Sequence, residues 1–223
     1  DEGTDANGHR QQSRTDALGR LASVYEISGD CGNYWGYTCA APYIITWTTY
    51  ATTRYTYDAL DQLRQVTDAA GNVTTMTYNA LGQKISMSDP DMGQWTYQYD
   101  AAGNLTRQDD AKRQRLCFYY DELNRLTGKW YGLVDDNCPS GNPPLAVRYA
   151  YDQAPNAVGR RNRLDDASGY TTWTYDPRGR VTNETKTIDG VPYATGYIYD
   201  ALDRVTSTTY PNNETVHHTY NAA

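Results

Sequence analysis

Pairs of tyrosines separated by one smaller residue recur along the chain, and an aspartate follows each pair. Four copies of this pattern occupy residues 55–58, 97–100, 149–152 and 197–200. A large residue at every second position is the two-residue period of a β-strand that has one half-buried face. The pattern therefore predicts a chain built from β-strands.

Weaker copies of the motif fill the gaps between these four and show a fixed period. They end at Tyr78-Asn79, Tyr120-Asp121, Tyr175-Asp176 and Tyr220-Asn221. The second tyrosines stand at 57, 78, 99, 120, 151, 175, 199 and 220, so four of the seven intervals equal 21 residues. Such self-similarity predicts an array of like structural units. The positions expected to carry this repeat are Tyr57, Asp58, Tyr78, Tyr99, Asp100, Gly103, Tyr120, Asp121, Tyr151, Asp152, Tyr175, Asp176, Gly179, Tyr199, Asp200 and Tyr220.

Two turns are predicted in each period. The first begins at the aspartate, whose side chain is suited to bond backbone N–H groups two residues on. It ends at a Gly, Asn or Asp, such as Asp61 or Gly103, and these residue types tolerate a left-handed backbone. A second turn follows half a period later, for example at 68–71. Two strands of roughly five to seven residues complete the unit, so the fold class is all-β, a continuous antiparallel β-hairpin meander.

The whole chain is interpreted as one array. Residues 1–223 begin and end inside a repeat, which suggests a single segment cut from a longer array. A Cys-containing stretch at 22–54 and a Gly/Pro/Asn-rich loop at 131–148 interrupt the period, which resumes after each. About sixteen strands at ~4.8 Å spacing make a very wide sheet, and wide twisted sheets curl. A curved strip, a spiral shell or a β-solenoid is expected.

Composition supports this interpretation and excludes other classes. Leu, Ile, Val and Phe number only 30 of 223 residues, but 22 Tyr and 5 Trp, which suit a half-buried strand, replace them. The length is sufficient to bury a sizeable core. The net charge of −7 and a pI near 4.9 provide no basic surface for nucleic acid. No apolar run approaches the ~20 residues of a membrane helix.

The motif Tyr-Asp-x-x-Gly-Arg-Leu at a 21-residue period resembles the YD repeat of Rhs proteins, wall-associated Rhs-like proteins, teneurins and insecticidal toxin-complex shell components. The resemblance covers residues 5–223. It implies a β-sheet strip that spirals into a hollow shell, often around a C-terminal toxic domain that is released by aspartate-dependent self-cleavage. Asp176-Pro177-Arg178-Gly179 is superficially similar to the cleavage region but lies at an ordinary turn position. No catalytic residue is therefore assigned.

The four cysteines allow three pairings. We favour disulfides Cys31–Cys39, within the first insertion, and Cys117–Cys138, between a strand and the second insertion. Free thiols and metal binding are alternatives, although no pair has the spacing of a zinc site. Disulfides would indicate an oxidising compartment.

No other residues form a convincing chemical site. His9, His217 and His218 are the only histidines, and adjacent strand residues point to opposite faces. The stretch 89–93 resembles the start of a calcium loop, but position twelve is Asp100 where a calcium loop has Glu. We therefore expect no catalytic, metal or cofactor site, and an enzyme is the least favoured class.

The tyrosine rows are interpreted as structural contacts, with Arg20, Arg125, Arg180 and Arg204 placed to lie over the rings. The predicted function is a non-enzymatic wall segment of a large secreted or cell-surface bacterial protein that encloses a toxin polypeptide. The alternative is an extracellular fibre or adhesin, with an aromatic face that binds glycans. Expected partners are the rest of the array, the cargo, and further copies through edge strands.

Overall fold

The computed structural model describes residues 2–4, 10–30, 46–141 and 143–221. These residues fold into β-strands and turns and include no helix long and apolar enough to cross a membrane. The chain divides into two compact units. Unit 1 comprises 1–98 with 110–112, and unit 2 comprises 99–109 with 113–223. The predicted all-β fold class is confirmed.

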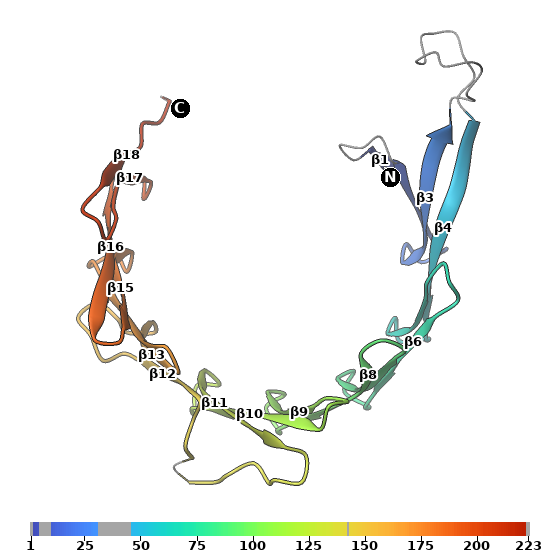
Figure 1. Ribbon diagram of the computed structural model, residues 1–223, viewed down its shortest axis with the longest axis horizontal. Coiled ribbons are helices and arrows are strands. Elements are labelled where there is room, and N and C mark those ends of the chain that lie inside the picture. The colour runs from blue at the N-terminus through green and yellow to red at the C-terminus, as the bar shows by residue number, and fades with distance from the viewer. Residues whose placement is uncertain (1, 5–9, 31–45, 142, 222–223) are drawn as a thin grey trace. The chain divides into compact units, whose positions relative to one another are not determined.

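Most of the strands are joined by short turns, and a long loop connects β11 to β12 (Figure 1). Those at the start of the chain are β1 (Glu2–Thr4), β2 (Arg10–Thr15), β3 (Leu21–Asp30), β4 (Thr46–Tyr57), β5 (Leu63–Thr67), β6 (Val73–Tyr78), β7 (Lys84–Asp89) and β8 (Gly93–Tyr99). The remainder are β9 (Leu105–Asp109), β10 (Gln114–Tyr120), β11 (Leu126–Leu133), β12 (Val147–Tyr151), β13 (Arg161–Asp166), β14 (Gly169–Tyr175), β15 (Val181–Ile188), β16 (Val191–Tyr199), β17 (Val205–Thr209) and β18 (Thr215–His217).

Each unit is an antiparallel meander in which sequential strands pair. The ladders run without a crossover from β1 to β8 in unit 1 and from β9 to β18 in unit 2. The first insertion, expected at 22–54, lengthens β3 and β4, which pair from Ser23↔Arg54 to Asp30↔Thr46. Its central part, 31–45, lies outside the described residues.

A β-bulge marks the second tyrosine of the repeat. Tyr57 pairs with Leu63 although Thr56 pairs with Gln65, and Tyr175 and Tyr199 show the same one-residue shift. The turn beyond the bulge ends on a left-handed residue, with φ 61° at Asp61 and 79° at Gly82. The conformation expected from the Gly, Asn and Asp pattern is confirmed.

Very few side chains are fully buried, which corrects the expectation of a sizeable core. Among the described hydrophobic residues only Cys117 and Ala157 are buried. The accessible surface is 15115 Å², whereas a compact protein of this mass exposes about 10,000 Å². Most strand residues are half-buried because each unit is one sheet with no second sheet or helix packed on it in the described part of the chain.

The second insertion lies on one face of unit 2. Cys117 on β10 and Cys138 in the loop form a disulfide with a Cα–Cα distance of 5.8 Å. The Tyr119 hydroxyl donates to the Pro139 carbonyl at 2.8 Å, from the same face as Cys117. Phe118 points to the opposite face, which carries the tyrosine rows. Cys31 and Cys39 lie outside the described residues.

Candidate functional site

The aspartate of each repeat organises its own turn. Asp200 accepts hydrogen bonds at Oδ1 from the backbone N–H groups of Leu202 (2.9 Å) and Arg204 (3.0 Å). Its Oδ2 pairs with Arg204 Nε at 2.8 Å. Asp16, Asp121 and Asp176 make the same three contacts, whereas Asp58 makes the two backbone bonds and pairs with Arg64. One carboxylate therefore closes the turn and orients an arginine, since four acceptor sites are available on it.

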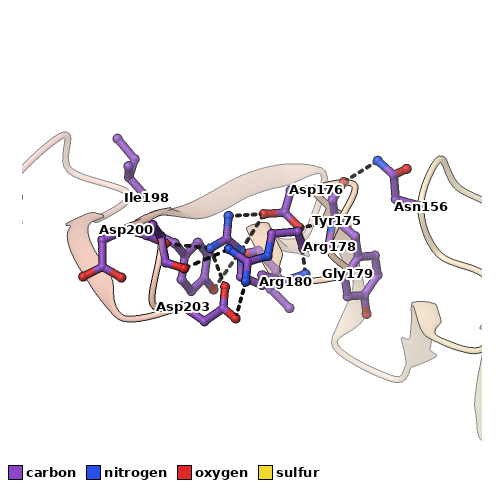
Figure 2. Close-up of polar contacts among 12 residues, drawn as sticks. Asn156, Tyr175, Asp176, Arg178, Gly179, Arg180, Ile198, Asp200 and Asp203 are labelled. Atoms are coloured by element: carbon purple, nitrogen blue, oxygen red, sulfur yellow. Dashed lines mark hydrogen bonds and ion pairs between the residues drawn. The ribbon is translucent and has the colours of Figure 1, made fainter.

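The arginine reaches from its own repeat into the next one. The Arg180 guanidinium donates hydrogen bonds to the Asp200 carbonyl at 2.9 Å and to Asp203 Oδ1 at 2.7 Å (Figure 2). It also lies 4.7 Å from the centre of the Tyr199 ring. In unit 1, Arg20 makes the corresponding contacts with the turn that begins at Asp58 and with Tyr57. Arg125 and Arg204 also lie over a tyrosine of the following repeat, so the predicted placement of all four arginines is confirmed.

The tyrosine completes the link by bonding back to the preceding repeat. The Tyr199 hydroxyl donates to the Val181 carbonyl at 2.7 Å, which lies at the first residue after the preceding turn. Tyr57, Tyr78, Tyr120, Tyr151, Tyr175 and Tyr220 donate to the carbonyls of Leu21, Leu63, Leu105, Leu126, Arg161 and Val205. Because these seven hydroxyls meet equivalent carbonyls, each of these repeats positions its neighbour.

These contacts shift the pKa values of the groups involved. The backbone N–H of Arg204, followed by its side chain, holds the pKa of Asp200 below its ordinary value despite opposing desolvation. Asp176 shows the same lowering, caused chiefly by the Arg180 backbone N–H. Burial raises the pKa of Tyr199 above 10.0, so its hydroxyl keeps its proton at neutral pH. The cluster is thus charged on the Asp and Arg and neutral on the Tyr.

Two turns depart from the Asp–Arg pairing in a way the sequence analysis missed. Asn79 closes its turn through Oδ1 as Asp200 does, and its amide nitrogen bonds Gln83 Oε1 at 2.6 Å. Asp100 bonds the amide of Asn104 at 2.9 Å. The sequence does contain a pattern that predicts these pairs. In the turns whose first residue pairs with the residue four positions later, that later residue is Arg or Asn where the first is Asp, and Gln where the first is Asn. A neutral pair replaces the ion pair without changing the turn.

A second charge cluster, not anticipated from sequence, lies beside the disulfide. Asp109 on β9 accepts hydrogen bonds from the guanidinium groups of Arg115 and Arg107, and Arg115 also bonds the Asp136 carbonyl. Burial raises the pKa of Asp109, but the two arginines outweigh it and lower the value to about 2. This cluster anchors the base of the second insertion to β9 and β10.

The second insertion also walls a cavity of about 510 Å³ in unit 2. Tyr119, Tyr149, Pro143, Leu145 and Arg148 are among its lining residues. Leu145 occupies the space above Gly128, where a Cβ would lie 2.3 Å from its methyl carbon. The cavity thus lies between the loop and the residues of β10 to β12 that it covers.

No group of three His, Cys, Asp or Glu residues suited to a metal lies within the described part of the chain. In the turn that resembles a calcium loop, the Asp89 carboxylate accepts hydrogen bonds from the backbone N–H groups of Asp91 and Met92 and from the Thr74 hydroxyl. His218 Nε2 lies 3.4 Å from the Thr208 hydroxyl, and His9 is outside the described residues.

Comparison with known proteins identifies the repeat. The profile of the RHS Repeat family matches residues 57–92, which span the turn at Asp58 and the turn at Asn79. This chain carries the Rhs repeat at residues 57–92. The contacts of the matched segment recur in the repeats that follow, down to the bond from Tyr220 to Val205. No protein in the curated set matches the sequence.

Solved structures resemble most of this chain in fold. The crystal structure of TcdB2-TccC3 matches with a TM-score of 0.67 and 15% identity over 96% of this chain. The crystal structure of TcdB2-TccC3-TEV matches with a TM-score of 0.63 and 18% identity over 93% of this chain. The structure of the Photorhabdus luminescens Tc holotoxin pore matches with a TM-score of 0.63 and 19% identity over 94% of this chain. This chain spans 12% of the length of each of those chains.

Proposed function

We propose that this Rhs-repeat segment is part of the wall of a β-shell that encloses a polypeptide cargo, within a larger secreted or cell-surface bacterial protein. The observation that carries the proposal is the fold similarity to TcdB2-TccC3 chains, of which the segment spans 12%. The proposed role needs a continuous wall, and a meander with few fully buried side chains suits a wall better than a compact domain.

Three features of the chain support a wall. The contacts among Tyr, Arg and Asp join each repeat to the next and leave the strand number free to grow. The disulfide between Cys117 and Cys138 suits an oxidising compartment. The tyrosine face carries rings whose hydroxyls are already bonded to backbone carbonyls, so we assign those residues a structural role.

Electron microscopy of the native protein, purified from its source without excision, tests the proposal. We expect closed hollow particles with interior density, and a cargo polypeptide that proteases cleave only after the shell is opened by denaturant. If the particles are instead long fibres with a regular axial repeat, the shell proposal is wrong and the protein is an extracellular fibre or adhesin. Encapsulation would be contradicted by particles with an empty interior, or by proteases that cleave the entire polypeptide without denaturant.

A further inference from the structure

The cavity beside the second insertion has one apolar wall. Tyr119, Pro143 and Leu145 are among its lining residues. The Tyr119 hydroxyl donates to the Pro139 carbonyl, Pro143 is buried, and the disulfide joins the insertion to β10. The wall is therefore formed before any ligand arrives, which lowers the cost of ordering these groups on binding.

Polar side chains that bond no described residue also line this cavity. Thr127 is the extra residue of the β-bulge in β11, so it has no ladder partner on β10. Its hydroxyl makes no hydrogen bond within the described part of the chain. Gln153 bonds Asn162 through its backbone N–H, which leaves its side-chain amide exposed and unbonded among the described residues. The hydroxyl and the amide can each donate to and accept from a ligand.

Arg148 gives the cavity a charged group without a protein partner. It is exposed and lies on β12, opposite Asp165 of β13. Asp165 is the cross-strand residue with which an arginine ordinarily pairs, but Arg163 already bonds that carboxylate at 2.7 Å. Among the described lining residues Asp121 is the one carboxylate, and it pairs with Arg125 at 2.7 Å. The Arg148 guanidinium therefore makes no ion pair with a described residue.

We propose that this cavity binds one hexuronic acid unit, a sugar ring that carries a carboxylate. The ring has an apolar C–H face, which suits the wall at Tyr119, and an edge of hydroxyl groups, which suits Thr127 and Gln153. The carboxylate suits Arg148, because a guanidinium bonds a carboxylate through two parallel N–H groups. A volume of about 510 Å³ is ordinary for a small-molecule site, and such sites combine an apolar lining with a few polar groups.

Other occupants suit the cavity less well. An extended peptide binds by adding a strand to a sheet edge, but β11 and β12 are each paired on both sides. An aliphatic carboxylate would bond Arg148 and leave Thr127 and Gln153 without partners. The site is also distinct from the tyrosine rows, whose hydroxyls are bonded to backbone carbonyls. The proposal does not depend on whether the array forms a shell or a fibre.

Titration of the whole chain with glucuronic acid and with galacturonic acid, followed by ligand-observed NMR, tests the proposal. Glucose lacks the carboxylate and cyclohexanecarboxylate lacks the ring hydroxyls, so these two compounds are the comparison ligands. We expect saturable binding of at least one of the uronic acids. Its dissociation constant should be at least about tenfold below that of either comparison ligand, because each of these lacks hydrogen bonds that the lining residues offer.

Variants test the assigned groups one at a time. Arg148→Gln is expected to raise the dissociation constant of the uronic acid at least about tenfold. The matched control is Arg178→Gln, whose side chain is 52% exposed and lies outside the cavity, and it should leave the constant unchanged. Thr127→Val should weaken binding of the uronic acid and leave that of cyclohexanecarboxylate unaffected.

Circular dichroism separates loss of binding from loss of folding. The spectra of the parent and the variants are expected to be the same, because Arg148 is exposed and valine keeps the shape of Thr127. The proposal would be overturned if the parent binds neither uronic acid, or if it binds cyclohexanecarboxylate equally well. Unchanged binding of the uronic acid by a folded Arg148→Gln variant would also overturn it.

Discussion

In seven repeats a tyrosine hydroxyl donates a hydrogen bond to one backbone carbonyl of the preceding repeat. The ladder between β15 and β16 begins at Asn183, opposite Gly196, so Val181 lies beyond it, and the Tyr199 hydroxyl donates to the Val181 carbonyl there. An unsatisfied, partly buried carbonyl is costly. At the scale of the residue, the choice of Tyr over Phe is therefore explained by hydrogen bonding as well as by packing.

Replacing Tyr199 by Phe is expected to lower the free energy of unfolding by about 0.5–1.5 kcal/mol. The ring keeps its place against Arg180, but the Val181 carbonyl loses its donor. Urea unfolding followed by far-ultraviolet circular dichroism measures the change. Tyr193→Phe is the control, because Tyr193 is 46% exposed and its hydroxyl bonds no described residue. An equal effect of both substitutions would show that the hydroxyl bond contributes nothing specific.

At the scale of the element, the second insertion is a covering loop tied to one face of the hairpin that β10 and β11 form. The disulfide closes it over 21 residues of sequence separation. Gly128 and Gly132 leave space on that face, which Leu145 and the Trp130 ring fill. The loop thus covers Cys117, the largest fully buried side chain among the described residues.

Breaking this disulfide by Cys117→Ser is expected to release the insertion. On the loop-entropy account the bond contributes about 3 kcal/mol for a loop of this size. Hydrogen exchange of residues 134–146 should become much faster, whereas β14 to β16 should be unchanged. Reductant should have the same effect on the parent and no additional effect on the variant. Slow exchange of the loop in fully reduced protein would show that its packing alone holds it.

At the scale of the whole molecule, polar contacts rather than a buried apolar core stabilise the folded state. The described chain has few fully buried apolar side chains, and ion pairs between Asp and Arg occur in both units. Many carboxylates are hydrogen-bonded in the folded state, including Asp121 and Asp200. The stability of such a protein depends on their ionisation.

Acid is accordingly expected to unfold the protein at higher pH than it would a protein with a large apolar core. The Ser168 hydroxyl, then Lys186, lowers the pKa of Asp166 to about 2, and Asp109 has a similar value. Both lie below the ordinary value near 3.9 of an unfolded chain. Their contribution is therefore complete above about pH 5 and is lost as the pH falls toward 2.

Thermal unfolding between pH 7 and pH 2 measures this dependence. Asp166→Asn is expected to lower the midpoint at pH 7 and to have little effect at pH 2, which flattens the profile. Asp91→Asn is the control, because its exposed turn position gives its carboxylate no ion pair with a described residue. A parent profile that stays level to pH 2 would contradict the account.

Much of this architecture was predictable because each repeat is specified by the spacing of its tyrosines and by the residue types at its turns. The period of the tyrosines gave the strands, and the Gly, Asn or Asp at positions such as Asp61 and Gly179 predicted the left-handed turns. The arginines over tyrosine rings followed from the alternation of strand faces. The expectation of a sizeable core was wrong because length predicts burial only for chains that pack in more than one layer.

The sequence by itself determined the meander, its turns and the residues that repeat, because these depend on neighbours within about six positions. Only the tertiary structure decided which carbonyl each tyrosine bonds, since Tyr57 and Leu21 are 36 residues apart. It also decided that the second insertion covers the face opposite the tyrosine rows. Those facts depend on the strand register, which is fixed by backbone pairing across repeats rather than by any local pattern.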